Sequence, residues 1–214
     1  MLTVVEETFE CRGPAYTRVP LFLHPYNIGV YNKYSMVKIY TKNGDEGSTT
    51  LIGGKKARKD AEIFGVLGTL DELNASLSFV DEKKIQSQLF ELGALIANPT
   101  ATSSDYSKLR NWAVSIEKRI DKVEEKLPRL KNFILPGGTQ LAKQYHLCRS
   151  ICRRFERELV HYYCLDEALN NGVKELALAY INRMSDLFFV LARYANFTEG
   201  VADDVWIGRK KKTS

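Results

Sequence analysis

The sequence of 214 residues has few of the residues that build metal and disulfide sites, with four cysteines and three histidines. The cysteines (Cys11, Cys148, Cys152 and Cys164) include no C-x-x-C pair, and Cys148 and Cys152 stand among charged residues. A structural zinc site needs several such ligands at close spacing, and a disulfide scaffold needs a far higher cysteine content. We therefore expect reduced thiols.

Long apolar runs and an excess of one charge are also lacking. No uninterrupted apolar run approaches the roughly 20 residues that a membrane-spanning helix requires. Lys and Arg number 31 against 26 Asp and Glu, and four of the resulting +5 charges lie at residues 209–212. A nucleic-acid-binding surface needs its basic residues on the folded body. The composition, 44% hydrophobic and 27% charged, therefore predicts a globular protein with one core and no membrane or nucleic-acid partner.

Residues 1–35 show neither a helical nor a strand period. Their acidic residues balance their basic ones, whereas a mitochondrial transit peptide is acid-poor and a secretory signal continues into an apolar run. We expect an N-terminal extension at 1–35, with Met36 as an alternative start, a helical domain at 36–200 and a basic C-terminal tail at 201–214. The expected location is the cytoplasm, with the mitochondrial matrix as the alternative.

From Asp60 onward, apolar residues recur at helical spacing. This pattern predicts five helices: from Asp60, a cap-competent residue, to Leu77, then about 82–97, about 107–127, from the turn after Phe133 to about 165, and about 175–197. The connections are mostly short and no repeat or sustained heptad occurs, so neighbouring helices should run antiparallel. The predicted fold is all-α, an up-and-down five-helix bundle resembling a four-helix bundle, with an N-terminal phosphate-binding loop.

The first candidate site is that loop, which follows a short β-prone run, VKIYT, and is rich in Gly, Thr and Lys. Gly44 and Gly47 flank Asp45 and allow several backbone amides to approach one anion. Lys42 adds charge, and the hydroxyl groups at the two ends of the loop add donors: Thr41, Ser48 and Thr49. Asp45 could orient a donor or hold Mg²⁺. The P-loop pattern GxxxxGK[ST] is absent, and a surface turn would have the same composition.

The second candidate is one face of the predicted fourth helix, which carries His146, Arg149, Arg153, Glu156 and Arg157. Apolar residues repeat on another face of the same helix, which suits packing against the core. Guanidinium groups offer planar, forked donors to phosphate or to an interfacial carboxylate. A solvated face with Arg–Glu pairs one turn apart would show the same pattern.

The third candidate is the predicted fifth helix, where Asn182 and Asp186 lie one turn apart beside a core stripe. Polar groups at such positions need partners, and we expect Asp186 to pair with an arginine of the fourth helix. A purely structural pair would look the same. Asp71, Glu72 and Asn74 of the first helix are further candidate partners.

Four segments together resemble the PduO-type ATP:cob(I)alamin adenosyltransferases: VKIYTKNGDEGST, KDAEIFGVLGTLDELNASL, FILPGGTQLAKQYHLCRSICRRFER and YINRMSDLFFVLARYAN. They follow the family's order and spacing over about residues 36–199. The resemblance implies a homotrimer of five-helix bundles with ATP and corrinoid bound between subunits. The implied reaction transfers the 5′-deoxyadenosyl group of ATP to the cobalt of cob(I)alamin or a related corrinoid, giving adenosylcobalamin and triphosphate.

The resemblance also implies roles for single residues. The TxxGDxGxT loop would bind the ATP polyphosphate, with Lys42 and Lys59 as basic partners and Mg²⁺ carried mainly by the phosphates. Arg149 would form an intersubunit salt bridge with Asp71, and Asp186 would hold the arginines of the fourth helix. The other residues implied at the nucleotide are Arg153, Arg154, Glu156, Asn182 and Arg157.

Phe133 matches the family's aromatic residue that crowds the lower face of the corrin ring. Loss of the lower axial ligand gives a four-coordinate Co(II) that is easier to reduce, and an apolar ring keeps water away from that face. Phe133, Arg153 and Asp186 are thus the expected catalytic residues. A corrinoid reductase and an adenosylcobalamin-dependent enzyme are implied partners. The alternative is a helical bundle that binds ATP and corrinoid as a sensor or carrier, without turnover.

Overall fold

The computed structural model describes residues 40–52, 54–98, 101–165 and 173–207. The chain divides into two units, Met1–Thr41 and Lys42–Ser214. Only Tyr40 and Thr41 of the first unit are described, so the predicted extension at 1–35 lies outside the described residues. The basic residues 209–212 lie outside them as well.

The second unit is built on five long helices, which confirms the predicted fold class. These helices and two short ones are α1 (Glu62–Ser76), η1 (Leu77–Phe79), α2 (Lys83–Ile96), α3 (Ser103–Tyr106), α4 (Lys108–Glu124), α5 (Gln140–Leu165) and α6 (Val173–Thr198). Asp60 does not cap α1. Its carboxylate binds the Arg58 guanidinium at 2.6 Å instead, and Ala61 takes the N-cap position.

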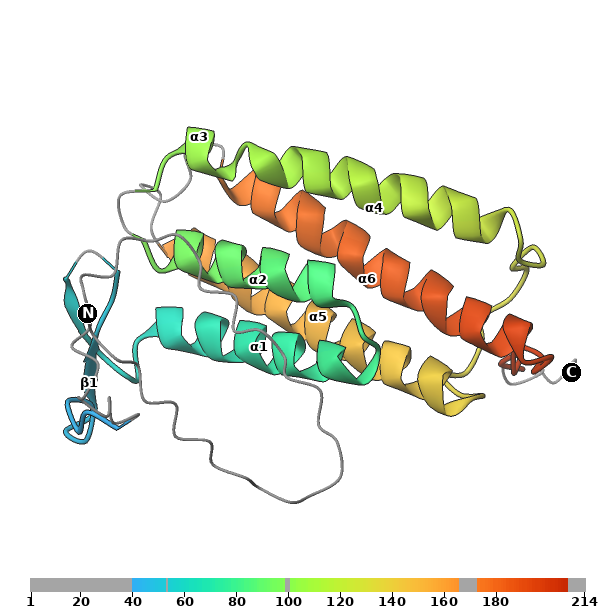
Figure 1. The fold of residues 1–214 in the computed structure, drawn as a ribbon, viewed down its shortest axis with the longest axis horizontal. Coiled ribbons are helices and arrows are strands. Elements are labelled where there is room, and N and C mark those ends of the chain that lie inside the picture. The colour runs from blue at the N-terminus through green and yellow to red at the C-terminus, as the bar shows by residue number, and fades with distance from the viewer. Residues whose placement is uncertain (1–39, 53, 99–100, 166–172, 208–214) are drawn as a thin grey trace, which may run out of the picture. The chain divides into compact units, whose positions relative to one another are not determined.

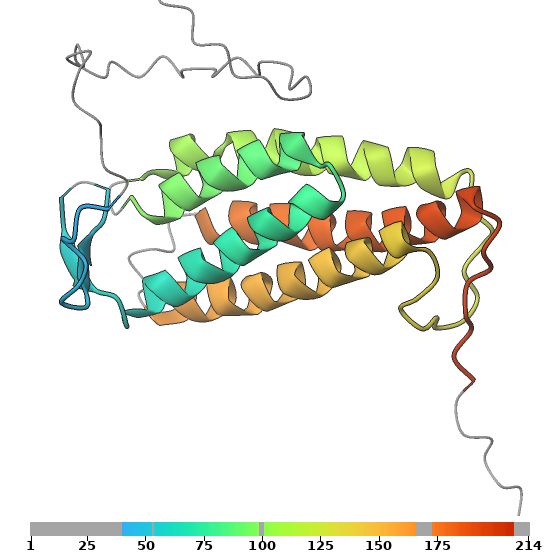
Figure 2. The same ribbon diagram turned by 60° about the horizontal axis from the view of Figure 1, so that its bottom comes forward.

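Helix α6 lies between α4 and α5, and α1 packs on the other side of α5 (Figure 1). Figure 2 shows α4, α6 and α5 in the same order, with α1 crossing in front of them at an angle. Their apolar stripes meet in one core, in which Leu73, Phe155, Tyr180 and Phe188 have no exposed side-chain surface. Burial of each such side chain contributes roughly 1.5–3 kcal/mol, so the 3.6-residue period of the sequence is a packing requirement.

The predicted loop contains a β-hairpin that no pattern in the sequence indicated. Strands β1 (Ser48–Thr50) and β2 (Lys56–Arg58) pair antiparallel, with Thr49 opposite Ala57. Each strand has three residues, which is too short to show an alternating pattern in the sequence. The hairpin lies beyond the N-terminal end of α1, at the end of the bundle where α5 finishes (Figure 1).

The FILPGG segment, residues 133–138, lies at the opposite end of the bundle, before α5 begins (Figure 1). The chain after α6 pairs with it: the Leu135 amide donates to the Asp204 carbonyl, and the Trp206 amide donates to the Phe133 carbonyl, both at 2.8 Å. Backbone pairing with the bundle therefore extends beyond residue 200, where the C-terminal tail was predicted to follow the helical domain. Residues 204–206 hold the segment that carries Phe133.

Three cysteines within the described ranges, Cys148, Cys152 and Cys164, are free thiols. Burial raises the pKa of the Cys148 thiol, which suits a packing residue. Within the described residues, no helix is long and apolar enough to cross a membrane.

Candidate active site

The turn from Lys42 to Gly47 leads into the hairpin and forms the first group of candidate residues. Two backbone hydrogen bonds close it, from the Asp45 amide to Lys42 and from the Gly47 amide to Gly44, both at 3.2 Å. The positive φ angles of Lys42 (61°) and Gly47 (75°) reverse the chain direction. Ser48 and Thr49 follow as the first residues of β1, and Thr41 belongs to the other unit.

Lys59, for which the resemblance implied a role at the ATP phosphates, lies against this turn. Its amide donates to the Gly47 carbonyl at 2.8 Å. Its side chain crosses Gly44, because a Cβ atom added there would lie 2.8 Å from the Lys59 ammonium nitrogen. A side chain at position 44 would therefore displace the cation. Gly44, Gly47 and Lys59 form one compact cationic loop, which is suited to an anion.

The second group lies on α5 and α6. The Asn182 side-chain amide donates to the Glu156 carboxylate at 3.1 Å, so these two predicted residues meet. Arg153 and Arg157 are exposed beside them, and the Arg157 guanidinium donates to the Arg153 carbonyl at 3.0 Å. The Arg153 guanidinium has no partner among the described residues and is therefore available to a ligand.

Arg154 has a different setting from Arg153. Its guanidinium forms an ion pair with Glu72 of α1, and its Nε atom is buried without a partner among the described residues. Thr69 of α1 donates to Glu158 of α5 nearby. Arg154 thus ties α5 to α1 in this chain.

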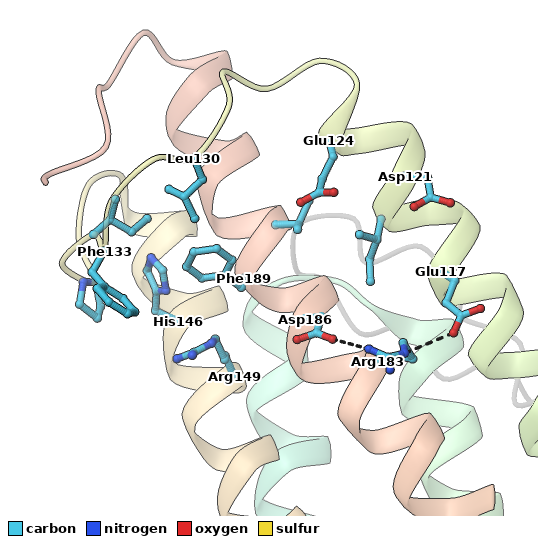
Figure 3. Close-up of a pocket in the computed structure, with 14 residues that line it drawn as sticks. Glu117, Asp121, Glu124, Leu130, Phe133, His146, Arg149, Arg183, Asp186 and Phe189 are labelled. Atoms are coloured by element: carbon cyan, nitrogen blue, oxygen red, sulfur yellow. Dashed lines mark hydrogen bonds and ion pairs between the residues drawn. The ribbon is translucent and has the colours of Figure 1, made fainter.

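A cavity of about 700 Å³ forms the third group and opens between α4, α6, the start of α5 and the FILPGG segment (Figure 3). Phe133 lies at its edge with 81% of its surface exposed. The apolar part of the wall includes Phe189 and Leu130. The polar part consists of Glu117, Asp121, Glu124, His146, Arg149, Arg183 and Asp186.

Asp186 does not pair with the arginines of α5, so that expectation was wrong. It accepts a hydrogen bond from Arg183 at 2.8 Å, and Arg183 also reaches Glu117 at 3.2 Å (Figure 3). Arg183 lies one turn earlier on the same helix, and Asp186 is exposed, so burial does not force it toward α5. Asp186 remains beside the cavity, as part of a Glu117–Arg183–Asp186 chain.

Arg149 and His146 line the cavity from α5. The Arg149 guanidinium lies 5.6 Å from the centre of the Phe189 ring, a cation–π contact. His146 is 7% exposed, and burial, followed by the nearby Arg149 charge, lowers its pKa from 6.5. A neutral imidazole is therefore favoured. Asp71 is exposed on α1, so its carboxylate is accessible for the intersubunit salt bridge with Arg149 that the resemblance implied.

The phosphate-type loop and the cavity lie at opposite ends of α5 (Figure 1). That helix has 26 residues, so it is about 39 Å long at about 1.5 Å per residue. The cavity reaches along α5 as far as Arg149, which lies 16 residues or about 24 Å before Leu165, so the two groups of one chain are well separated. Residue spacing in the sequence does not reveal this separation. It also gives no signal that Arg183 and Phe189 belong to the candidate site.

The helical bundle, the cationic hairpin loop and the cavity are together typical of a ligand-binding protein, in which the loop suits an anion and the cavity a larger, partly apolar ligand. The family model for cobalamin adenosyltransferase matches residues 39–195, and the chain belongs to this family. This match confirms the family that the sequence resemblance predicted.

Curated relatives and solved structures agree. The chain is 38% identical to a corrinoid adenosyltransferase of Bacillus subtilis over 78% of the chain and 91% of that protein. It is 35% identical to human corrinoid adenosyltransferase MMAB over 79% of the chain and 73% of that protein. A variant PduO-type ATP:corrinoid adenosyltransferase from Lactobacillus reuteri, solved with cobalamin and ATP, has 35% identity and a TM-score of 0.71 over 80% of this chain and 100% of its own.

Proposed function

We propose that the protein is an ATP:corrinoid adenosyltransferase that converts cob(I)alamin and ATP to adenosylcobalamin and triphosphate. The observation that carries the proposal is the presence, in a chain of this family, of a cationic hairpin loop and of a large cavity with Phe133 at its edge. The loop suits a polyphosphate, and the cavity suits a broad, partly apolar ligand.

The cobalt of the reduced corrinoid is the nucleophile. Its electron pair forms the bond to C5′ of ATP while the bond from C5′ to the phosphate oxygen breaks and triphosphate leaves. The protein supplies no nucleophile or base, so its residues position the two substrates and stabilise the charge on the leaving group. This accounts for a site with exposed arginine and lysine and with a buried neutral histidine.

The corrinoid occupies the cavity with its lower face against Phe133. The exposed aromatic ring excludes both water and a lower axial ligand, which favours the four-coordinate Co(II) that is easiest to reduce. Two backbone hydrogen bonds to residues 204–206 hold the segment that carries the ring. A corrinoid reductase would supply the electron, and an adenosylcobalamin-dependent enzyme would receive the product.

The triphosphate binds at the Lys42–Thr49 turn with Lys59, and Arg153 neutralises charge that develops on the leaving group. Glu156 and Asn182, joined at 3.1 Å, offer an acceptor and a donor to the nucleoside. No group of three potential ligands surrounds a metal position among the described residues. Mg²⁺ would be held mainly by the phosphates of ATP, with Asp45 as a carboxylate ligand within the turn.

The active site is shared between subunits of a homotrimer. The support is the separation along α5, because the loop and the cavity of one chain lie toward opposite ends of that helix. An exposed Phe90 beside Ile52, next to Asp71, gives the α1–α2 face an apolar patch suited to a subunit contact. The Asp71–Arg149 salt bridge would then form across that contact. The proposed location is the cytoplasm, which fractionation of the source cells would test against the mitochondrial matrix.

The test is an anaerobic assay with ATP, Mg²⁺ and chemically reduced cob(I)alamin, followed by the visible spectrum and by a separate measurement of triphosphate. Adenosylcobalamin and triphosphate in equal amounts are expected. Binding of both ligands without product would support the sensor or carrier instead.

A further inference from the structure

Three acidic residues follow one face of α4 along the cavity: Glu117, Asp121 and Glu124. Their spacing of four and three residues places them one above the other on a helix. Figure 3 shows them on the side of the cavity opposite Phe133 and His146. We call these three residues the acidic row.

The acidic row is only partly neutralised. Glu117 pairs with Arg183 at 3.2 Å, whereas the Asp121 and Glu124 side chains form no ion pair or hydrogen bond within the described residues. With Asp186, four carboxylates face the two guanidinium groups of the cavity, so its formal charge is −2 when His146 is neutral.

The opposite wall holds a polar group without a protein partner. The Nδ1 atom of His146 is buried and has no hydrogen bond within the described residues, and the whole side chain is 7% exposed. Burial lowers the pKa of this imidazole, so His146 adds no positive charge opposite the acidic row.

We infer that the acidic row, through Asp121 and Glu124, selects corrinoids whose peripheral groups are amides over corrinoids that carry free carboxylates there. This rests on the proposed function, because it takes the cavity as the corrinoid site. Amide N–H groups donate to carboxylates, whereas ligand carboxylates would meet like charge in a partly enclosed site. The repulsion against the wrong ligand supplies the selectivity.

The experiment compares cobinamide with its counterpart in which the peripheral amides are hydrolysed to carboxylates. Both are reduced chemically to Co(I), and kcat/KM is measured for the wild type and for the double variant Asp121→Asn/Glu124→Gln. This variant keeps side-chain size and the Glu117–Arg183 pair. Glu125→Gln is the matched control, since Glu125 directly follows α4, is exposed and does not line the cavity.

We expect the wild type and the control to prefer the amide form by about tenfold, through KM. The double variant should lose most of this preference. Added salt screens exposed charges, so it should reduce the ratio of kcat/KM for the amide form to that for the carboxylate form in the wild type. The same ratio in the double variant should not change with salt. Equilibrium dialysis of both corrinoids in their Co(II) state measures the same ratio without turnover.

Equal kcat/KM values and equal binding of the two corrinoids by the wild type would overturn the inference. An unchanged preference in the double variant would do so as well. Absence of product with both corrinoids, together with tighter binding of the amide form, would instead reject the proposed transferase and keep the selectivity.

Discussion

Arg193 of α6 joins that helix to the segments that contain Pro128 and Asp203, at the end of the bundle where the cavity lies. Its replacement by leucine should lower the free energy of unfolding. The side chain is 5% exposed, and its Nε donates to Asp203 while an Nη donates to the Pro128 carbonyl, both at 2.8 Å. Removal of one partner of a buried ion pair costs roughly 3–5 kcal/mol. The Asp203 side chain is 21% exposed, so water would partly solvate its unpaired carboxylate. We therefore expect the lower end of this range, a loss of about 3 kcal/mol.

Urea denaturation at one fixed protein concentration measures this loss, and for a chain of this size it corresponds to a fall in Tm of roughly 6–12 °C. The double variant Arg193→Leu/Asp203→Leu should recover part of the loss, because it removes the unpaired carboxylate. Arg129→Leu, at an exposed residue of the same region, is the control and should change the free energy of unfolding little. A loss below about 1 kcal/mol in Arg193→Leu, or a double variant no more stable than the single one, would refute the reasoning.

Three further changes test other parts of the molecule. Lys59→Ala should raise KM for ATP about tenfold or more with little change in Tm, whereas Lys56→Ala, exposed on β2 three residues earlier, should leave KM nearly unchanged; steady-state kinetics decide. Gly138→Ala should lower Tm strongly, because φ is +98° and the new Cβ would lie 2.1 Å from a side-chain oxygen, whereas Gly137→Ala meets no atom within 4 Å; equal Tm values would contradict this. Because burial lowers the pKa of His146 in the folded protein, its contribution to the free energy of unfolding is present above the unfolded pKa of about 6.5 and is lost as the pH falls toward the folded pKa. In His146→Phe the free energy of unfolding should therefore depend less on pH below about 6.5. Parallel pH curves for the wild type and the variant would show that another group titrates.

The helices could be predicted because burial imposes a period on every long helix. Each of α1, α2, α4, α5 and α6 begins and ends within a few residues of its predicted limits. Glu156 and Asn182 could be grouped for a related reason, since both lie on polar faces beside core stripes and such groups need partners.

The remaining features depend on contacts between residues far apart in the chain. The pairing of residues 204–206 with 133–135 spans about seventy positions, and no local pattern marks either segment as a partner. Asp186 had two possible sources of arginine, and only the folded helices show that Arg183 is the one within reach. The separation of the loop from the cavity likewise follows from the direction of α5 and not from residue spacing.

The measurement that tests the central claim most directly mixes two impaired variants, Lys59→Ala with a damaged loop and Phe133→Ala with a damaged cavity. The assay starts from the Co(II) corrinoid with a reductant and keeps ATP well below the KM of Lys59→Ala, so that each variant alone is slow. If one subunit supplies the loop and its neighbour the cavity, randomly reassembled trimers should regain roughly a quarter of the wild-type rate of adenosylcobalamin formation. Each variant alone, refolded in the same way, should stay near its own low rate. A mixture no more active than the mean of the two variants, beside an active wild type treated identically, would contradict an active site shared between chains.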